Sequence, residues 1–429
     1  MQGTLEMTIE IEALPPLRAT VFSPGIAGFT ESCRELFGQP SRLLRSDRGV
    51  AVFKNEDLRQ LAANPDVGQS PPAVLRKRSF SAPDGHGGTF FSTSLSHMLA
   101  NQFFTANPPI HKPVRQILAR QFMPKSVVAL EPLAQRIAKQ IIHEIPADAQ
   151  IDFTSDFAGR LTARFFGTLL GLEGSEQARI VDLMSAIMPM FFFDKTVEEL
   201  KAADEVAAEY MDLIIKAVHR TLAAGDNALV NTMAAELAQL DLEDDPERAG
   251  LVPDSIGLMM ASNLIDGFHT AAVAASSSVY LLLRNPHELA QVRAQPALAR
   301  AAVFEALRLL SPLTMTQRYT LSEIEYANVR IPAGTGVMMM WAIGNRDPEA
   351  FTDPDAFSLA RPRRNETTFG GGLHICPGRY VAGMIAETVV KEVCAANVQI
   401  SLAVDPCDWF GRSVLCQLVS MPVSIARSS

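Results

Sequence analysis

The longest apolar stretch of the chain, residues 254–284, constrains the fold more than any other feature of the sequence. It is bounded by Pro253 and Pro286, which predicts a helix about 45 Å long at a rise of ~1.5 Å per residue. Between its two end residues only Asp266 and His269 can carry charge near neutral pH. Such a helix is apolar on nearly all sides and must be buried, so we expect one long central helix.

A membrane span is the alternative for so long an apolar helix. Asn263, Asp266, His269, Thr270 and the serine run 276–278 make it a poor one, because polar side chains are costly inside a lipid bilayer. An acid in the middle of a buried helix also calls for compensation, since removing a charge from water costs several kcal/mol. Asp266 is therefore a candidate functional residue.

Apolar residues at helical spacing dominate the rest of the chain, so the fold is predicted to be mainly α with a minor β region. The predicted helices are 128–144, 157–172, 175–190, 196–223, 227–239, 287–293, 297–310 and 378–396. Short runs typical of strands lie near 41–53, 316–340 and 398–426. With 48% hydrophobic residues and no linker or repeat, residues 1–429 are expected to form a single domain.

The start of the chain, the cysteines and the net charge indicate a cytoplasmic protein. Acidic residues occupy the start, where a signal peptide needs a basic region. The cysteines lack paired spacing, which fits a reducing compartment. They are Cys33, Cys376, Cys394, Cys407 and Cys416. A formal charge of −9 argues against a general affinity for nucleic acid or an anionic membrane.

Cys376 lies in a glycine-rich segment, Phe369-Gly-Gly-Gly-Leu-His-Ile-Cys376-Pro-Gly-Arg379, directly before a predicted helix in which Pro377 suits the first position. Backbone N–H groups at a helix N-terminus stabilise a thiolate, and glycines let a large planar group approach. The alternatives are a zinc ligand, a catalytic nucleophile and a dinucleotide loop. A zinc site would need a second pair of ligands, and the sequence shows none. A catalytic nucleophile would need a base elsewhere in the chain, and a dinucleotide loop would need a βαβ unit.

This segment resembles the cytochrome P450 signature Phe-Gly-x-Gly-x-His-x-Cys-x-Gly. The matching residues are Phe369, Gly370, Gly372, His374, Cys376 and Gly378. Glu305, Arg308 and Arg361 look like the family's Glu-Arg-Arg structural triad. The resemblance spans roughly residues 100–400 and implies the mainly helical P450 fold, with the long helix over the haem and small β-sheets.

The resemblance implies a haem b cofactor whose iron is ligated by the thiolate of Cys376. The residues implied at the cofactor are Cys376, His111, Arg115, Arg318, His374, Phe369 and Gly370. His111-x-x-x-Arg115 resembles the helix motif that binds haem propionates, and Arg318 and His374 occupy the other propionate positions. Two anionic groups need such charge-assisted donors.

Thiolate ligation also implies a chemistry and a set of partners. Electron density from sulfur favours O–O bond cleavage, so insertion of oxygen from dioxygen is the expected outcome. Members of the family normally receive electrons from NAD(P)H through a ferredoxin or flavodoxin, and no reductase domain is present here. The expected docking residues are Lys112, Arg115, Arg120, Lys125 and Arg379. An ordinary solvated surface is the alternative, and we favour it for Lys125.

The long helix departs from the family pattern Ala/Gly-Gly-x-Asp/Glu-Thr, because it reads Asp266-Gly-Phe-His269-Thr270. The spacing predicts that Asp266, His269 and Thr270 project from one face, and we expect Asp266 to pair with His269 and raise its pKa. Such an acid–base couple would suit the use of peroxide. The alternatives are a hydrogen-bonded core histidine and an aspartate paired with an arginine.

The leading functional hypothesis is a monooxygenase that oxidises a hydrophobic or aromatic small molecule in bacterial secondary metabolism or catabolism. Residues 86–106, 184–193 and Leu313–Gln317 are expected to line the substrate pocket, with plain helix core as the alternative. The second hypothesis is an atypical enzyme that uses peroxide, or that couples or rearranges its substrate without inserting oxygen. The third is a non-catalytic haem sensor, which would have no evident need for Thr270.

Overall fold

Two units, each assembled from separate stretches of the chain, make up the computed structural model. Unit 1 consists of Met1–Phe90, Leu313–Ala356 and Arg364–Cys376, and unit 2 consists of Phe91–Pro312, Phe357–Arg363 and Pro377–Ser429. Within them the structure describes residues 8–18, 25–70, 94–109, 111–146, 148–192, 195–240, 256–395, 397–411 and 413–427. The single domain expected for residues 1–429 stays a prediction.

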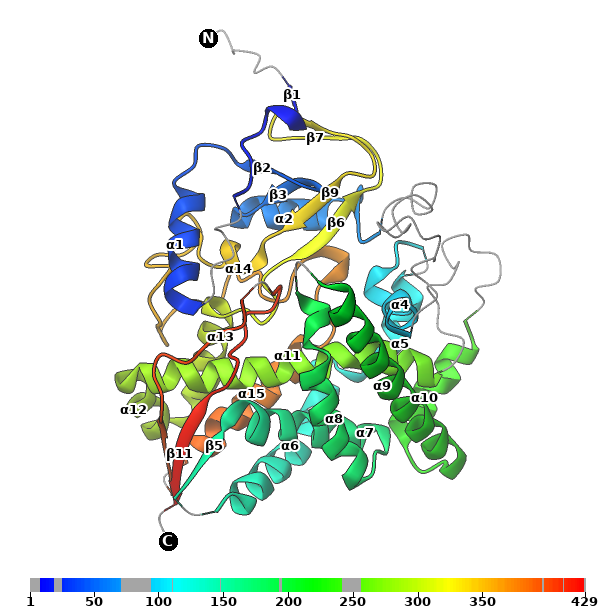
Figure 1. The fold of residues 1–429 in the computed structure, drawn as a ribbon, viewed down its shortest axis with the longest axis vertical. Coiled ribbons are helices and arrows are strands. Elements are labelled where there is room, and N and C mark those ends of the chain that lie inside the picture. The colour runs from blue at the N-terminus through cyan, green and yellow to red at the C-terminus, as the bar shows by residue number, and fades with distance from the viewer. Residues whose placement is uncertain are drawn as a thin grey trace. The chain divides into compact units, whose positions relative to one another are not determined.

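Unit 1 carries two sheets and a few helices (Figure 1). Its strands are β1 (Ile9–Glu10), β2 (Leu43–Ser46), β3 (Gly49–Val52), β4 (Val67–Gly68), β6 (Thr316–Thr320), β7 (Ile324–Tyr326), β8 (Val329–Ile331) and β9 (Gly336–Met339). The larger sheet has the order β2-β3-β9-β6-β4 and the smaller one has the order β1-β8-β7. The helices are α1 (Gly25–Phe37), α2 (Asn55–Ala63) and α14 (Trp341–Gly344).

The larger sheet joins segments that lie far apart in the sequence. Strands β3 and β9 pair in parallel, with Gly49 opposite Gly336. A Cβ on Gly49, whose φ is +137°, would lie 2.3 Å from the Gly336 carbonyl oxygen. Only glycine therefore permits the two backbones to approach this closely.

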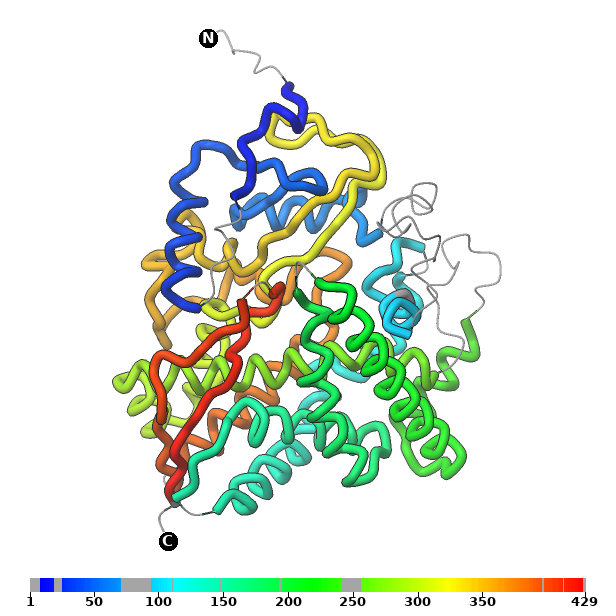
Figure 2. The backbone as a smooth tube through the Cα atoms, in the orientation of Figure 1, coloured from blue at the N-terminus to red at the C-terminus, as the bar shows by residue number. Residues whose placement is uncertain are grey.

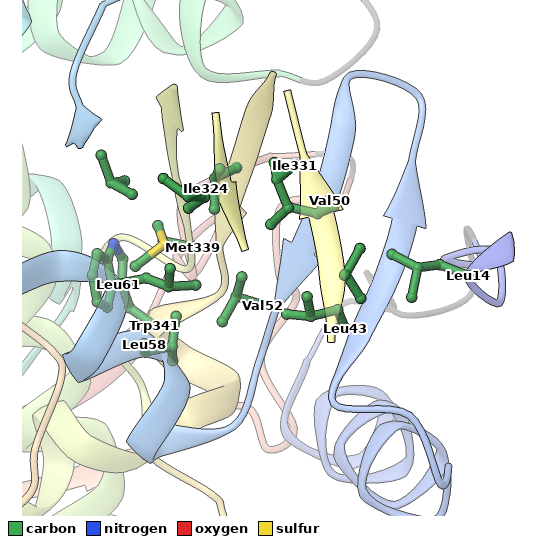
Figure 3. Packing of buried hydrophobic residues seen from close by; sticks show 13 residues of the cluster. Leu14, Leu43, Val50, Val52, Leu58, Leu61, Ile324, Ile331, Met339 and Trp341 are labelled. Atoms are coloured by element: carbon green, nitrogen blue, oxygen red, sulfur yellow. The ribbon is translucent and has the colours of Figure 1, made fainter. Parts of the chain in front are cut away.

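Apolar side chains from both parts of unit 1 form one buried cluster, shown in Figure 3. Its members are Leu14, Leu43, Val50, Val52, Leu58, Leu61, Val67, Ile324, Val329, Ile331, Val337, Met339 and Trp341. Burial of a large aliphatic side chain contributes about 1.5–3 kcal/mol, so this cluster holds the N-terminal segments to the 313–341 region. Trp341, a member of this cluster, is also the first residue of α14.

Unit 2 is mostly helical. Its helices are α4 (Ser94–Ala100), α5 (His111–Gln121), α6 (Pro124–Glu144), α7 (Arg160–Leu170), α8 (Gly174–Ala186), α9 (Val197–Ala224), α10 (Ala228–Ala238), α11 (Ile256–Arg284), α12 (Pro286–Ala294), α13 (Ala299–Leu309) and α15 (Arg379–Val393). A π-helix, Phe153–Gly159, leads into α7. One sheet of order β10-β11-β5 joins Val398–Leu402, Pro422–Arg427 and Ala149–Asp152.

Helix α11 is the long central helix expected from the sequence. Within unit 2 it packs against α7, α9, α13 and α15 (Figure 2). From Ile256 to Leu282 every residue is buried except Asp266, Gly267, Thr270 and Ala272, which are half-buried. Among the described residues, no helix has the length and apolar character that a membrane crossing requires.

The predicted secondary structure is largely confirmed. All nine predicted helices contain a helix of the structure, although 157–172 begins as a π-helix and 175–190 ends in a short 3₁₀ turn, Met188–Phe191. The three predicted β regions contain strands, and the family's mainly helical fold with small sheets is confirmed. One detail is wrong: α15 begins at Arg379, so Pro377 precedes the helix and does not occupy its first position.

Candidate active site

The segment around Cys376 forms a loop whose shape is held by backbone hydrogen bonds. The Cys376 N–H donates to the Phe369 carbonyl at 2.9 Å, and the Gly370 N–H donates to the Thr367 carbonyl at 2.8 Å. Thr367 is anchored in turn, because its hydroxyl donates to the Trp341 carbonyl at 2.8 Å. These hydrogen bonds therefore fix the backbone of the loop at Cys376.

Gly372 is the tightest point of this loop. Its φ is +63°, and a Cβ on it would lie 1.7 Å from the Ala62 carbonyl oxygen at the end of α2. Any other residue would be strained in this conformation and would collide with the backbone of α2. The glycines were expected to admit a planar group, but the structure gives Gly372 a different reason, its close passage over α2.

Cys376 has a different environment from the cysteines of the core. Burial raises the pKa of Cys33 to about 12 and that of Cys394 to about 11, which keeps both side chains as thiols. Cys407 also has a raised pKa because of burial. Cys376, by contrast, is half-buried. Because a thiolate is the ligand form of cysteine, Cys376 is the better candidate for binding a metal.

Glu305, Arg308 and Arg361 form the triad that the sequence predicted. Arg308 Nη2 and Arg361 Nε each donate to Glu305 Oε1 at 2.8 Å. The Ser358 N–H adds a third bond to the same oxygen at 3.1 Å. Arg308 is 1% exposed, so its ion pair is isolated from water, and removal of the acid would leave a buried charge uncompensated.

Arg318, on β6, is a buried cation that is close only to neutral groups among the described residues. One of its guanidinium nitrogens donates to the Thr316 hydroxyl at 2.9 Å and to the Gln317 carbonyl at 3.1 Å. Burial lowers the pKa of Arg318 to about 10, and no carboxylate opposes the shift. An anionic group would compensate this desolvated charge, so Arg318 fits a ligand that carries a carboxylate, such as a haem propionate.

The other residues predicted at the cofactor are divided between the units. His374, Phe369 and Gly370 belong to unit 1 with Arg318 and Cys376, and all three are half-buried. His111 and Arg115 open α5 in unit 2. His111 is 3% exposed, and Arg115 follows it by four residues, on the same side of the helix. The roles given to these residues stay predictions.

Asp266 is directed toward the segment that follows α4. Its carboxylate accepts a hydrogen bond from Gln102 Nε2 at 3.1 Å, while the Thr270 hydroxyl donates to the Asp266 backbone carbonyl at 2.6 Å. Burial raises the pKa of Asp266 to about 7, and the bond from Gln102 opposes that shift only in part. The Asp266 carboxyl group therefore titrates near neutral pH.

His269 has other partners, so the expected pairing of Asp266 with His269 is wrong. His269 Nε2 is hydrogen-bonded to Gln417 Oε1 at 2.6 Å, and the imidazole stacks on Phe191 with centroids 5.6 Å apart. Burial lowers the pKa of His269, opposite to the expected direction. The physical reason is that each side chain is hydrogen-bonded to a glutamine on another segment, and without a paired charge desolvation dominates both pKa values.

A partly open cavity of about 160 Å³ lies in unit 2 beside His269. Its wall includes Phe268 and Phe410 but is polar for much of its extent. The polar lining residues are Asp152, Thr154, Ser155, Thr162, Ser185, His269, Ser276, Ser277 and Gln417. This volume and lining suit several water molecules, so the bond between His269 and Gln417 borders a place that can hold ordered water.

The basic residues expected to dock a redox partner differ in their surroundings. Lys112 and Lys125 are exposed, whereas Arg120 forms an ion pair with Glu236 at 3.4 Å. Arg379 lies over the ring of Tyr380, 4.3 Å from its centroid. Lys112 and Lys125 are therefore more available to an acidic partner than Arg120 and Arg379 are.

The segments expected to line a substrate pocket are only partly described. Residues 86–93 and Phe193 lie outside the described residues, and Leu313–Gln317 belongs to unit 1. In the 184–192 stretch, Phe191 contacts His269, and the Phe192 ring lies 6.4 Å from that of Phe410. These aromatic contacts place the end of this stretch beside α11 and the C-terminal loop.

Sequence reasoning missed three residues that surround the α11 side chains: Gln102, Tyr210 and Gln417. Gln102 falls within the predicted 86–106 pocket segment, but its bond to Asp266 joins residues 164 positions apart. Nothing near Gln417 marks it as a partner of His269. The described residues contain no cluster of three or more side chains of the His, Cys, Asp or Glu type arranged to hold a metal.

The comparisons with known proteins agree with the sequence resemblance. The cytochrome P450 family model matches residues 73–393. The 6-deoxyerythronolide B hydroxylase of Saccharopolyspora erythraea is 28% identical over 337 residues, which cover 78% of this chain and 80% of that protein. The vitamin D(3) 25-hydroxylase of Pseudonocardia autotrophica is 26% identical over 326 residues, 75% and 77% of the two chains.

Solved structures show the same fold. A myxobacterial cytochrome P450 in complex with myristic acid superposes with a TM-score of 0.78 at 25% identity, over 94% of this chain and 98% of that one. The arrangement of helices and small sheets is therefore shared with that structure.

Proposed function

The chain belongs to the cytochrome P450 family of haem-thiolate monooxygenases, and we propose that Cys376 ligates the haem iron of an enzyme that oxidises a hydrophobic or aromatic small molecule. The observation that carries the assignment of Cys376 is the closed loop in which its N–H is bonded to the Phe369 carbonyl. Cys33 and Cys394 differ from it, because burial raises their pKa values. Haem bound through a thiolate supplies the activation of dioxygen for oxygen insertion.

Charged donors hold the propionates in this proposal. Arg318 supplies the buried guanidinium whose desolvation an anion would offset, and His111, Arg115 and His374 add donors at the positions implied by the family motif. Phe369 and Gly370 would border the haem at the loop that carries Cys376. The fit rests on Arg318, which has no carboxylate partner among the described residues.

Thr270 and His269 deliver protons in the proposed reaction. The Thr270 hydroxyl, now donating to the Asp266 carbonyl, is a short side chain that can redirect its proton by rotation. His269 is hydrogen-bonded to Gln417 at the wall of the polar cavity, which can supply water. The lowered pKa of His269 keeps its imidazole neutral near pH 7, so the ring can accept and release a proton.

Electrons come from an external ferredoxin or flavodoxin reduced by NAD(P)H. The exposed Lys112 supports a basic docking face, whereas the ion pair of Arg120 with Glu236 weakens its contribution. The substrate is a hydrophobic small molecule, which the aromatic contacts of Phe191 and Phe192 support. Two relatives are named as hydroxylases of 6-deoxyerythronolide B and vitamin D(3), which also favours an apolar substrate.

The use of peroxide depended on an acid–base couple of Asp266 and His269. The two side chains have separate partners, so no specific observation favours that alternative. Nothing in the described part of the chain specifically supports the third hypothesis, a haem sensor. We therefore retain the reductase-dependent monooxygenase.

The carbon monoxide spectrum of the reduced protein tests the proposal. We expect the absorption band that gives the family its name in the parent and in Cys394→Ser, since Cys394 is a buried thiol whose pKa burial raises. Cys376→Ser should lose the band, because an alcohol does not replace the thiolate. An unchanged band in Cys376→Ser would overturn the assignment of the ligand.

A further inference from the structure

The imidazole of His269 is held by contacts to two segments outside α11. Its Nε2 is hydrogen-bonded to Gln417 Oε1 at 2.6 Å, and its ring stacks on that of Phe191 with an interplanar angle of 19°. The His269 side chain is 6% exposed. Because an amide oxygen only accepts, the bond to Gln417 requires a proton on Nε2, which makes Nδ1 the basic nitrogen of the neutral imidazole.

The backbone around Gln417 is itself held in place. The Phe410 N–H donates to the Gln417 carbonyl at 3.0 Å, and the Val414 N–H donates to the Phe191 carbonyl at 2.9 Å. The C-terminal loop is therefore tied to the same residue whose ring stacks on His269. A side chain on a backbone restrained in this way can hold its partner in one orientation.

His269 and Gln417 both line the partly open cavity of about 160 Å³ in unit 2. Among the lining residues only Asp152, at the end of β5, carries a full charge near neutral pH, and α7, α8 and the C-terminal loop contribute neutral side chains. The Asp152 carboxylate accepts hydrogen bonds from the Thr154 N–H at 3.0 Å and the Met421 N–H at 2.8 Å. His269 therefore borders a space that is polar but nearly free of charge.

The hydrogen bond to Gln417 is the interaction that opposes desolvation of His269. Burial lowers the pKa of His269, the bond to Gln417 raises it in part, and no charged group contributes. Asp266, the acid on the same helix, is hydrogen-bonded to Gln102 instead. Without a charged neighbour, the hydrogen-bond partner decides how an imidazole holds its proton.

We propose that Gln417 is a positioning residue, which fixes His269 as the tautomer protonated on Nε2 and leaves Nδ1 to accept a proton. The Nε2–H stays bonded to the Gln417 oxygen throughout. The imidazole gains one proton at Nδ1, becomes a cation that this oxygen stabilises, and later releases the proton from the same nitrogen. The proposal rests on the proton delivery proposed above for His269 and adds the residue that controls it.

Nitrogen NMR of the histidine rings tests the tautomer in the haem-loaded enzyme. The protein is labelled with ¹⁵N-histidine, reduced and saturated with carbon monoxide, which makes the haem iron diamagnetic. The chain has 8 histidines, so the signals absent from His269→Gln identify His269. The ring-nitrogen shifts report which nitrogen carries the proton. We expect the proton on Nε2 in the parent, and a parent with the proton on Nδ1 would overturn the proposal.

Two substitutions at Gln417 separate its shape from its chemistry. Gln417→Glu keeps an acceptor and adds a charge, so it should keep the tautomer and raise the ratio of charged to neutral His269 imidazole about tenfold or more at a given pH. Gln417→Met keeps the length of the side chain and removes the acceptor, so the two tautomers should become mixed. Gln399→Glu, at an exposed position of β10, is the matched control and should leave the titration of His269 unchanged.

An unchanged titration of His269 in Gln417→Glu would overturn the proposal. Gln417→Met carries the test if Gln417→Glu does not incorporate haem, and a single Nε2–H tautomer in that variant would also overturn it. The pH profile of NAD(P)H oxidation with a ferredoxin and its reductase is the second readout. Its apparent pKa should move to higher pH in Gln417→Glu and not in Gln399→Glu, and a profile that does not follow the NMR titration would overturn the positioning role.

The carbon monoxide band of each variant reports separately on the ligation of the iron by Cys376. A protein that lacks the band while its His269 titration responds to Gln417→Glu would contradict the proposed family function and not the contact with Gln417. A protein that has the band and an unresponsive His269 would contradict the role of Gln417 alone. The two failures are therefore distinguishable.

Discussion

The Cys376 loop and the Asp266–Thr270 segment of α11 achieve their chemistry by different means. The loop is shaped by backbone hydrogen bonds and by the left-handed conformation of Gly372, and it matches the family signature at every fixed position. The helical segment departs from the family pattern at Asp266 and His269, whose pKa values burial displaces in opposite directions. The difference teaches that backbone conformation determines the shape of the Cys376 loop, whereas burial and hydrogen-bond partners determine the protonation of the side chains in the helical segment.

A pair of glycine substitutions gives the largest expected contrast. Gly372→Ala should abolish haem incorporation, since the new Cβ meets a backbone oxygen at 1.7 Å in a strained conformation. Gly267→Ala should retain haem, because its nearest contact is Phe166 at an ordinary 3.4 Å and alanine favours the helix. Haem-to-protein ratios and thermal unfolding measure both. Full haem content in Gly372→Ala would end the distinction between the two regions.

The pH dependence of stability sharpens the helical side of the comparison. The pKa of Asp266 is raised from 3.8 to about 7, so the folded state keeps its proton over a range where the unfolded state has lost it. Stability from this group is therefore lost as pH rises from about 4 to about 7, by on the order of 4 kcal/mol at most. Tyr210 is the titratable group coupled to Asp266 from α9.

Asp266→Asn should abolish that loss. The difference in unfolding midpoint between Asp266→Asn and the parent should grow in favour of the variant between about pH 5 and about pH 7, and stay constant above it. Calorimetry of the two proteins at matched salt measures the difference. A constant offset across the whole range would mean that Asp266 ionises normally.

A substitution at Arg318 tests whether a side-chain charge contributes to haem binding in addition to the backbone of the Cys376 loop. Arg318→Met keeps the length of the side chain and removes the buried charge, so haem should be released about tenfold faster or more, the equivalent of one charge-assisted hydrogen bond. Transfer of haem to apomyoglobin gives the rate. Arg330→Met, at an exposed position of unit 1, is the control. Equal rates of haem release in both variants would mean that Arg318 does not bind a propionate.

The smallest expected effect concerns the surface. Lys112→Glu should slow electron transfer from a ferredoxin a few-fold at low salt, and the difference should vanish as salt rises, because exposed charges are screened. Arg120→Glu should have less effect, since Glu236 already neutralises Arg120. Stopped-flow reduction at several salt concentrations provides the rates. A salt-independent rate would place the docking face elsewhere.

Long helices were predictable from the sequence because their apolar spacing repeats over several turns. Helix α11 was predicted as 254–284 and runs from Ile256 to Arg284. The short helices α1 and α2 were missed, since their packing depends on strands β2 and β3 and on the distant 336–341 region. Strand β5 was missed for the same reason, because it exists only through its pairing with β11.

The candidate site divides in the same way. The Glu305 triad and the Cys376 loop could be predicted, because their residues match motifs of the cytochrome P450 family. The partners of Asp266 and His269 could not, because Gln102 and Gln417 reach them through tertiary folding. The expectation of an Asp266–His269 pair also assumed that a spacing of three brings side chains together, when each had a better partner on another segment.

The order of strands in unit 1 has a consequence for the folding of the chain during its synthesis on the ribosome. Strands β2, β3 and β4 emerge within the first 68 residues, but their neighbours β6 and β9 lie at 316–339. At a synthesis rate of roughly 5–20 residues per second, the N-terminal strands wait on the order of ten to fifty seconds for their partners. Their open edges during that interval are the part of the nascent chain most in need of a chaperone.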